Sequence, residues 1–260
     1  FKQVLVMVNV NKWAAGKPLT RKLYMVDSYL REYLCEILDY IVEKGRRYYV
    51  VLNQTIFHPK SGGQPSDTGW IIGDGFRFEV RKVLDVSGVI VHYGKLVEGE
   101  MSGQGSTVKC VINWERRYKV MRLHTAGHIL DYAIRNVYGR VVDTLNVFHG
   151  PPEPYVVYDA HSPSSDELEK IVKIANRIVS ENRPVRIMFV SEKELTKAIL
   201  NAPNIQRLPK SDKYRIVMIE EANAIPCTGT HVKRTGEIGR IVVKKVEELS
   251  RGFKLIYDVE

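Results

Sequence analysis

The chain has 260 residues, of which 44% are hydrophobic and 27% are charged, a composition typical of a globular protein with one large domain or two modest ones. The net charge of +9 favours a polyanionic partner such as a nucleic acid. No apolar run is long enough to span a membrane and no signal-peptide pattern opens the chain, which argues against a membrane protein. Three cysteines are too few for a disulfide framework, so we expect a cytoplasmic protein. Because Phe1 rather than a methionine comes first, we expect the natural start to lie upstream.

Residues 1–112 are predicted to form a domain rich in β-strands. Residues 48–52 are a β-branched and aromatic run, and residues 76–83 alternate apolar and charged side chains, as a half-buried strand does. Glycines recur at turn-like intervals in the second half of this region. The periodicity of residues 28–42 fits either a helix or a pair of strands.

The character of the chain changes near Asn113, and we place the second domain at residues 113–260. Asn113 has the side chain of a helix N-cap, and the apolar residues that follow indicate a helix ending before Gly139. Ser164, with acidic residues after it, predicts the start of a second helix with an apolar stripe.

The remaining elements are predicted to alternate. We expect strands at residues 184–190, 214–220 and 238–243, and a short helix at residues 192–200. Helices interleaved with non-parallel strands indicate an α+β fold.

Two motifs have the spacing of metal ligands. His124 and His128 lie four apart in a predicted helix and therefore present two imidazoles to one point in space. Cys227 and His231 have the same spacing, beside Pro226 on a predicted turn. Cysteine and histidine are the ligands that tetrahedral zinc prefers, so we predict one zinc ion bound by all four residues.

The alternative for any free cysteine is a buried apolar thiol. We assign Cys35 and Cys110 to that alternative.

Residues 57–69 form a predicted loop that contains Gly62, Gly63 and Gln64. Two glycines let the backbone approach a ligand closely, and a glutamine amide both donates and accepts hydrogen bonds. Such a loop is suited to approach the end of an RNA chain or to orient a water, and the alternative is an ordinary turn between strands.

Basic residues cluster with aromatic residues at 44–49 and again at 116–119. Lysine and arginine bind phosphates and tyrosine stacks on bases, which favours RNA or DNA as a partner. The alternative is a solvated surface with tyrosines in the core.

In their order along the chain, these motifs resemble those of the free-standing alanyl-tRNA editing proteins (AlaX) and of the editing domain of alanyl-tRNA synthetase. The resemblance runs from about Leu23 to the C-terminus. Its segments are Asp27–Leu30, Gly62–Gly69, Trp114–Tyr118, His124–His128, Cys227–Val232 and Thr235–Gly239. The Gly-Gly-Gln loop, together with a β-rich first domain, is similar to the medium-length form.

The resemblance implies a β-barrel-like N-terminal domain, with strands where residues 28–42 are ambiguous. It implies that an α/β sandwich editing domain with a mainly antiparallel sheet follows. The implied activity is that of a trans-editing hydrolase, which removes serine, with glycine as a second candidate, from tRNA(Ala) and spares alanyl-tRNA(Ala).

An editing pocket must demand the serine hydroxyl, since an unfilled hydrogen-bonding site penalises alanine. We look for the partner of that hydroxyl among Thr125, Thr144 and Thr230. The full set of site residues comprises the metal ligands His124, His128, Cys227 and His231, the catalytic or substrate-positioning residues Gly62, Gly63, Gln64, Thr125, Thr144 and Thr230, and the RNA-binding residues Arg116, Arg117 and Lys119.

The chain departs from the family pattern in places. The family usually has glycine where Ser61 and Thr228 stand, histidine where Leu123 stands, and often threonine where Gly127 stands. None of these changes removes a ligand, although Ser61 and Thr228 bear on amino-acid selectivity. Residues 144–160 match the family poorly, and the residues before Asp27 have no match.

Three rival interpretations remain. A peptide-release factor also uses Gly-Gly-Gln on an ester-linked tRNA, but it does not explain the metal ligands. The editing domain of threonyl-tRNA synthetase shares those ligands but not the Gly62–Gly69 loop. A non-catalytic, zinc-stabilised tRNA-binding module is the third, because four protein ligands make a closed site. In an enzyme, the ion would therefore take a fifth ligand or lose one, such as His231.

Overall fold

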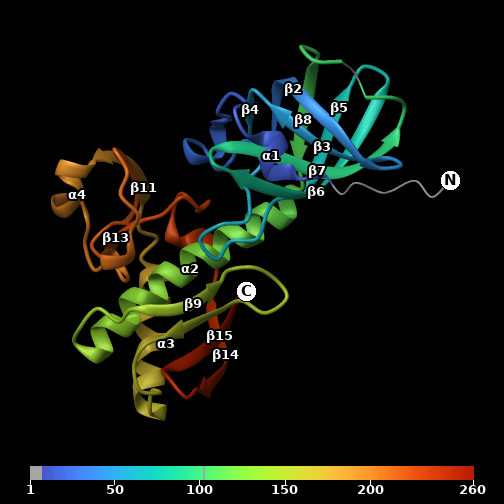
Figure 1. The fold of residues 1–260 in the computed structure, drawn as a ribbon. Helices are drawn as coiled ribbons and strands as arrows, with labels where there is room; N and C mark the ends of the chain where they lie inside the picture. The colour runs from blue at the N-terminus through green and yellow to red at the C-terminus, as the bar shows by residue number, and fades with distance from the viewer. Residues whose placement is uncertain (1–7, 102) are drawn as a thin grey trace. The chain divides into compact units, whose positions relative to one another are not determined.

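The computed structural model describes residues 8–101 and 103–260, and the chain divides into two compact units (Figure 1). The barrel unit consists of the described residues up to Lys60 together with Ser66–Arg117. The C-terminal unit consists of Ser61–Pro65 together with Tyr118–Glu260. The domain boundary expected near residue 112 stays a prediction.

The described residues of the barrel unit form a closed antiparallel barrel, in the strand order β2-β3-β7-β6-β5-β8. These strands are β2 (Glu32–Lys44), β3 (Arg47–Leu52), β5 (Gly69–Gly73), β6 (Phe76–Val86), β7 (Val89–Glu98) and β8 (Thr107–Ile112). Closure leaves no sheet edge unpaired. The β-barrel-like first domain is therefore confirmed.

The ambiguous segment of residues 28–42 is mostly one long strand. Ser28 lies before it, and β2 runs from Glu32 to Lys44 with β3 on one side and β8 on the other. Pairing with two partners decides for a strand where local periodicity fits a helix as well. In β6 the side chains alternate as predicted, with Phe76, Phe78 and Val80 in the barrel core.

Short elements complete the described part of the barrel unit. They are α1 (Val10–Ala14), β1 (Arg21–Lys22), η1 (Leu23–Met25) and β4 (Gln54–Thr55). β1 pairs with β4 in parallel.

The C-terminal unit combines helices with two antiparallel sheets, in the orders β14-β15-β10-β9 and β11-β12-β13. Its elements are α2 (Trp114–Tyr138, from residue 118 onward), β9 (Thr144–Phe148), β10 (Tyr155–Tyr158), α3 (Ser165–Ser180), β11 (Val185–Ser191), α4 (Glu192–Ala198), η2 (Ile205–Arg207), β12 (Lys213–Ile219), β13 (Asn223–Pro226), η3 (Thr235–Ile238), β14 (Ile241–Glu248) and β15 (Phe253–Val259). The α+β fold class is confirmed. No helix of the described residues is long and apolar enough to cross a bilayer.

Both predicted helix starts are confirmed by their caps. The Asn113 side chain accepts a hydrogen bond from the Arg116 N–H at 3.1 Å, and α2 follows. Ser164 and Glu167 form a capping box at the start of α3. Each cap satisfies N–H groups that have no partner within the helix.

The middle of α2 is enclosed on all sides. Every residue from Leu123 to Leu130 is buried, including two histidines and Thr125. A helix with an ordinary amphipathic pattern would leave one face in water. Buried polar groups need partners, so this stretch predicts a site rather than a simple core.

Candidate metal centre and substrate site

Four side chains converge in the C-terminal unit. His124 and His128 come from α2, while Cys227 and His231 come from the loop after β13, and their ligand atoms all lie within 4.8 Å of one another. Cys227 Sγ lies 3.6 Å from His124 Nε2 and 3.4 Å from His231 Nε2. Ligands of a tetrahedral zinc, with its usual bond lengths, are spaced by about 3.6 Å. The donor set and the spacing therefore fit a zinc ion.

The turn that carries Cys227 depends on its backbone. The Cys227 N–H donates to the Arg215 carbonyl at 2.9 Å, and an Arg215 Nη1–H donates to the Cys227 carbonyl at 2.6 Å. At Gly229, a Cβ atom would lie 2.2 Å from His124 Cε1 and 2.8 Å from Gln64 Oε1. Only glycine fits where the turn passes so close to His124 of the candidate cluster.

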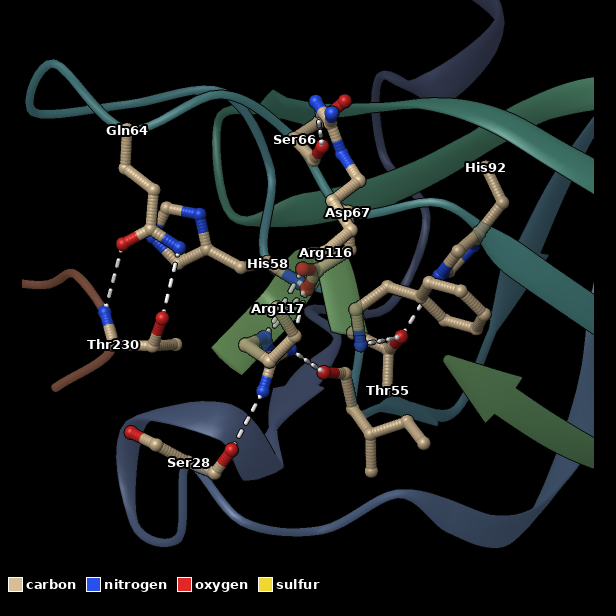
Figure 2. A network of polar contacts seen from close by, with 12 residues as sticks. Ser28, Thr55, His58, Gln64, Ser66, Asp67, His92, Arg116, Arg117 and Thr230 are labelled. Atoms are coloured by element: carbon tan, nitrogen blue, oxygen red, sulfur yellow. Dashed lines mark hydrogen bonds and ion pairs between the residues drawn. The ribbon is translucent and has the colours of Figure 1, made fainter. Parts of the chain in front are cut away.

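Gln64 orients the imidazole of His124. Gln64 Oε1 accepts a hydrogen bond from the Thr230 N–H at 2.9 Å, and Gln64 Nε2 donates to Thr230 Oγ1 at 2.9 Å (Figure 2). These two bonds determine which end of the amide is oxygen. His124 Nδ1, 3.0 Å from that oxygen, therefore carries the proton and donates, which leaves Nε2 as the metal-facing lone pair.

Thr125 does the same for His231. Its Oγ1 donates to the Met121 carbonyl at 2.8 Å, so His231 Nδ1, at 3.1 Å, must donate to Thr125. The Val232 N–H is a second donor to the same oxygen at 3.2 Å. The Thr125 hydroxyl thus has no proton left for a substrate.

Burial governs the charge of His128 and Cys227, the other two members of the candidate cluster. It lowers the pKa of His128 to about 3, with His149 and Arg215 acting in the same direction, so this imidazole is neutral at pH 7, the form that binds metals. His128 Nδ1 has no hydrogen-bond partner among the described residues. Burial also raises the pKa of the Cys227 thiol, an effect that a bound cation would reverse.

The structure adds one residue that sequence reasoning missed. The His149 ring stacks on His124 with centroids 4.5 Å apart and an interplanar angle of 16°. The Tyr257 hydroxyl donates to the Leu123 carbonyl at 2.9 Å, so it accepts from His149 Nδ1 at 2.7 Å. Burial lowers the pKa of His149 to about 4, so this ring is also neutral at pH 7.

Gly127 was the signal that could have revealed His149. A Cβ atom at this position would lie 2.5 Å from His149 Cε1 and 3.3 Å from the Tyr257 hydroxyl. A glycine in the middle of a helix is destabilising unless another group occupies the space of its missing side chain.

The remaining predicted substrate residues lie in two places. Thr230 is buried beside the metal cluster, bonded to Gln64. Thr144, at the start of β9, instead borders a cavity that Gly63 and Pro226 also line. Gly62 and Gly63 both adopt positive φ, at 55° and 75°.

Arg117 does not occupy a surface where RNA phosphates could reach it. It is fully buried in the barrel unit, ion-paired with Asp67, and its guanidinium donates to the carbonyls of Ser28 at 2.9 Å and Ile56 at 2.6 Å (Figure 2). The prediction of an RNA contact is corrected for this residue, because all of these contacts are internal. A buried guanidinium that is paired and hydrogen-bonded holds its surroundings together.

Arg116 and Lys119 are half-buried. Arg116 Nη2 contacts the Ser66 carbonyl at 3.4 Å, and Lys119 Nζ donates to Asp258 at 2.7 Å and to the Val259 carbonyl at 2.8 Å. Their role in RNA binding stays a prediction.

Comparison with known proteins covers most of the chain. Residues 36–116 match the family model of class II (A) tRNA synthetases, and residues 214–257 match that of the threonyl and alanyl tRNA synthetase second additional domain. The alanyl-tRNA editing protein AlaX-M of Methanosarcina acetivorans is 34% identical over 247 residues, which are 92% of this chain and 98% of that protein. The chain belongs to the family of alanyl-tRNA editing proteins.

Longer relatives share the same region. The alanyl-tRNA editing protein AlaX-L of Pyrococcus horikoshii is 34% identical over 90% of this chain and 56% of its own length. The alanine–tRNA ligase of Ignicoccus hospitalis is 33% identical over 93% of this chain, which spans only 26% of the ligase. Membership in the editing family confirms the predicted enzyme class, a hydrolase of aminoacyl-tRNA.

Proposed function

We propose that this alanyl-tRNA editing protein hydrolyses the ester between serine and tRNA(Ala) in trans, and spares alanyl-tRNA(Ala). Glycyl-tRNA(Ala) is the second candidate substrate. The observation that carries the proposal is the ordered cluster of His124, His128, Cys227 and His231, oriented by Gln64 of the Gly-Gly-Gln loop. Family membership supports a tRNA ester as the substrate.

Zinc is the metal that the site fits best. The four donors are the nitrogen and sulfur atoms that it prefers, and the spacing at the cluster matches a tetrahedral ion. When bound, zinc would supply Lewis-acid polarisation of the ester carbonyl.

The protein's own groups would orient and enclose the reacting ester. Gln64 and Thr125 hold two imidazoles in one tautomer, which keeps the cluster in a single geometry. Gln64, Thr125, His149 and Thr230 are all buried, so little water competes at the site. Aminoacyl esters are already activated, and positioning supplies much of the remaining rate enhancement.

Serine selectivity is proposed to depend on Thr230. Its Oγ1 accepts from Gln64 Nε2 at 2.9 Å, so its own O–H can still donate to a substrate hydroxyl. Thr144 Oγ1 accepts from the Asn204 side chain and has no acceptor for its own O–H among the described residues, whereas the proton of Thr125 is donated to Met121. An alanyl ester would leave the Thr230 hydroxyl without its partner, which penalises alanine.

Binding of the tRNA body is proposed to use exposed cations. Lys44, Arg46 and Arg47 lie exposed at the turn between β2 and β3. Tyr48 packs against the barrel core, so it is no platform for a base. Phosphate neutralisation by these lysine and arginine side chains suits the net charge of +9.

Deacylation of pre-charged tRNA(Ala) tests the proposal. The zinc-loaded protein should release serine at least tenfold faster than alanine, an estimate set by one buried hydroxyl contact. A Cys227→Ala variant, which lacks one ligand, should release neither serine nor alanine faster than buffer alone does. If the wild-type protein also leaves both esters intact, the non-catalytic, zinc-stabilised tRNA-binding module becomes the better account.

A further inference from the structure

The His149 ring is fixed beside the metal cluster by contacts on several sides. The residue directly follows β9, and its backbone N–H donates to the Gly63 carbonyl at 2.8 Å. The ring stacks on His124 with centroids 4.5 Å apart, and it occupies the space that a side chain at Gly127 would need. The position of the ring is therefore set before a substrate arrives.

Tyr257 determines which ring nitrogen of His149 carries the proton. The Tyr257 hydroxyl donates to the Leu123 carbonyl at 2.9 Å, so it accepts the proton of His149 Nδ1 at 2.7 Å. In the neutral ring, Nε2 then holds a lone pair and acts as a hydrogen-bond acceptor. Among the described residues Nε2 has no hydrogen-bond partner, and it is not fully enclosed by them. A small polar group can therefore reach it.

Other side-chain acceptors beside the cluster already have donors. Thr125 Oγ1 receives two hydrogen bonds, one from a ring nitrogen and one from a backbone N–H. Gln64 Oε1 also receives two, and Thr230 Oγ1 receives one from the Gln64 amide. Compared with these three oxygens, His149 Nε2 is the acceptor that still lacks a donor.

The hydroxyl of a serine ester is the donor that suits this lone pair. We propose that His149 Nε2 accepts a hydrogen bond from that hydroxyl, which makes His149 a specificity-determining residue of the editing reaction. The inference rests on the proposed function, since it assigns a second contact to the serine that is hydrolysed there. The hydroxyl is only a few bonds from the ester carbonyl, so a group that binds it must lie beside the cluster, as this ring does.

Two groups would then recognise the serine hydroxyl from both sides. Thr230 would donate to its oxygen, and His149 would accept a hydrogen bond from its O–H. An alanyl ester has no hydroxyl and would leave both groups unpaired, which penalises alanine more than one unpaired group does.

Single-turnover deacylation of seryl- and alanyl-tRNA(Ala) tests this role. His149→Phe keeps an aromatic ring to stack on His124 but removes the acceptor, so the ratio of the serine rate to the alanine rate should fall about tenfold. The loss of a merely structural residue would slow both rates by the same factor. His161→Phe, which changes an exposed histidine of the C-terminal unit, is the matched control and should keep the wild-type ratio. Zinc content is measured for both variants to verify that the cluster is intact.

An NMR titration of the zinc-loaded wild type requires neither hydrolysis nor a variant. The probes are adenosine derivatives that carry serine or alanine on the ribose through an amide, which resists hydrolysis. The ¹⁵N resonance of His149 Nε2 should shift on addition of the seryl amide and stay unchanged with the alanyl amide, because only serine has a hydroxyl to donate.

The outcomes separate this inference from the proposed function. An unchanged rate ratio in zinc-loaded His149→Phe, or a resonance that responds to neither amide or equally to both, overturns the role of His149 and leaves serine hydrolysis in place. If the wild type hydrolyses neither ester, the proposed function fails and the titration alone decides whether His149 binds a hydroxyl. The titration likewise decides if His149→Phe does not fold.

Discussion

Gln64 Oε1 accepts a hydrogen bond from His124 Nδ1 at 3.0 Å, across 60 positions of sequence. Gln64 belongs to the short segment Ser61–Pro65, which groups with the C-terminal unit although the residues on both sides of it group with the barrel unit. The Gly-Gly-Gln loop is therefore part of the support of the metal cluster. Gln64 thus supports His124, one of the four side chains of the candidate metal cluster.

Gln64→Ala should weaken zinc binding by about 10- to 100-fold, because the His124 imidazole loses the acceptor that orients it. Competition with a chromogenic chelator measures the affinity. Gln104→Ala, which changes an exposed glutamine of the barrel unit, is the matched control and should bind zinc like the wild type. Wild-type affinity in Gln64→Ala would show that the hydrogen bond has no part in metal binding.

Cys227→Ala should lower the zinc content from one ion per chain to none, since three remaining donors hold the metal poorly. Metal analysis after dialysis gives the content, and circular dichroism verifies that the variant is folded. Cys35→Ala removes a buried thiol in the barrel core and should retain the ion. Loss of zinc from both variants would point to general destabilisation instead.

Gly63→Ala should slow single-turnover deacylation by at least about tenfold, a change worth roughly 1.4 kcal/mol of activation free energy. A Cβ at Gly63 would lie 2.5 Å from Val147 Cγ2 and 3.0 Å from the Val147 carbonyl oxygen, so the Gln64 loop must shift. Gly62→Ala is the control, since it meets no atom within 4 Å although its φ is also positive. Similar rates for both variants would contradict a close packing requirement.

Arg117→Gln should destabilise the protein by about 3–5 kcal/mol, because Asp67 is left as an unpaired buried charge. Urea unfolding measures this change. The dependence of tRNA affinity on salt should stay as in the wild type, since Arg117 has no access to phosphates. If tRNA affinity depended less steeply on salt in a folded Arg117→Gln protein than in the wild type, Arg117 would bind RNA after all. Arg116→Gln provides the comparison for a half-buried neighbour.

His92 should make the protein less stable in mild acid. Burial lowers its pKa from 6.5 to about 4, while a hydrogen bond to the Val50 carbonyl opposes the shift. As the pH falls, His92 is therefore protonated in the unfolded chain before it is protonated in the folded protein. Its contribution to the free energy of unfolding is fully present above pH 6.5 and is lost as the pH falls toward 4. The loss approaches about 3 kcal/mol at the lower pH.

Burial also lowers the pKa values of His128 and His149, so these residues add to the loss of stability in acid. The contribution of His92 is therefore measured as the difference between the wild type and a variant that lacks this imidazole. Urea unfolding of the wild type and His92→Gln is compared at pH 7.5 and pH 5. The wild type should lose more stability than the variant between these conditions. Equal losses would show that His92 is not buried in its neutral form.

Several features were determined by local sequence alone. The spacing of His124 and His128 works because an α-helix repeats every 3.6 residues, whatever surrounds it. Asn113 and Ser164 cap their helices through hydrogen bonds to residues three positions later. The alternation in β6 likewise reports a strand with one face in a core.

Other features required the tertiary structure, because they depend on partners far along the chain. β2 became one strand only through pairing with β3 and β8, and Arg117 was enclosed by Asp67 and two carbonyls from separate segments. His149 reached the cluster because Gly127 leaves space above α2. Local periodicity determines the conformation that a segment prefers. Its burial and its hydrogen-bond partners depend on packing against segments far along the chain, and no single stretch of sequence encodes that packing.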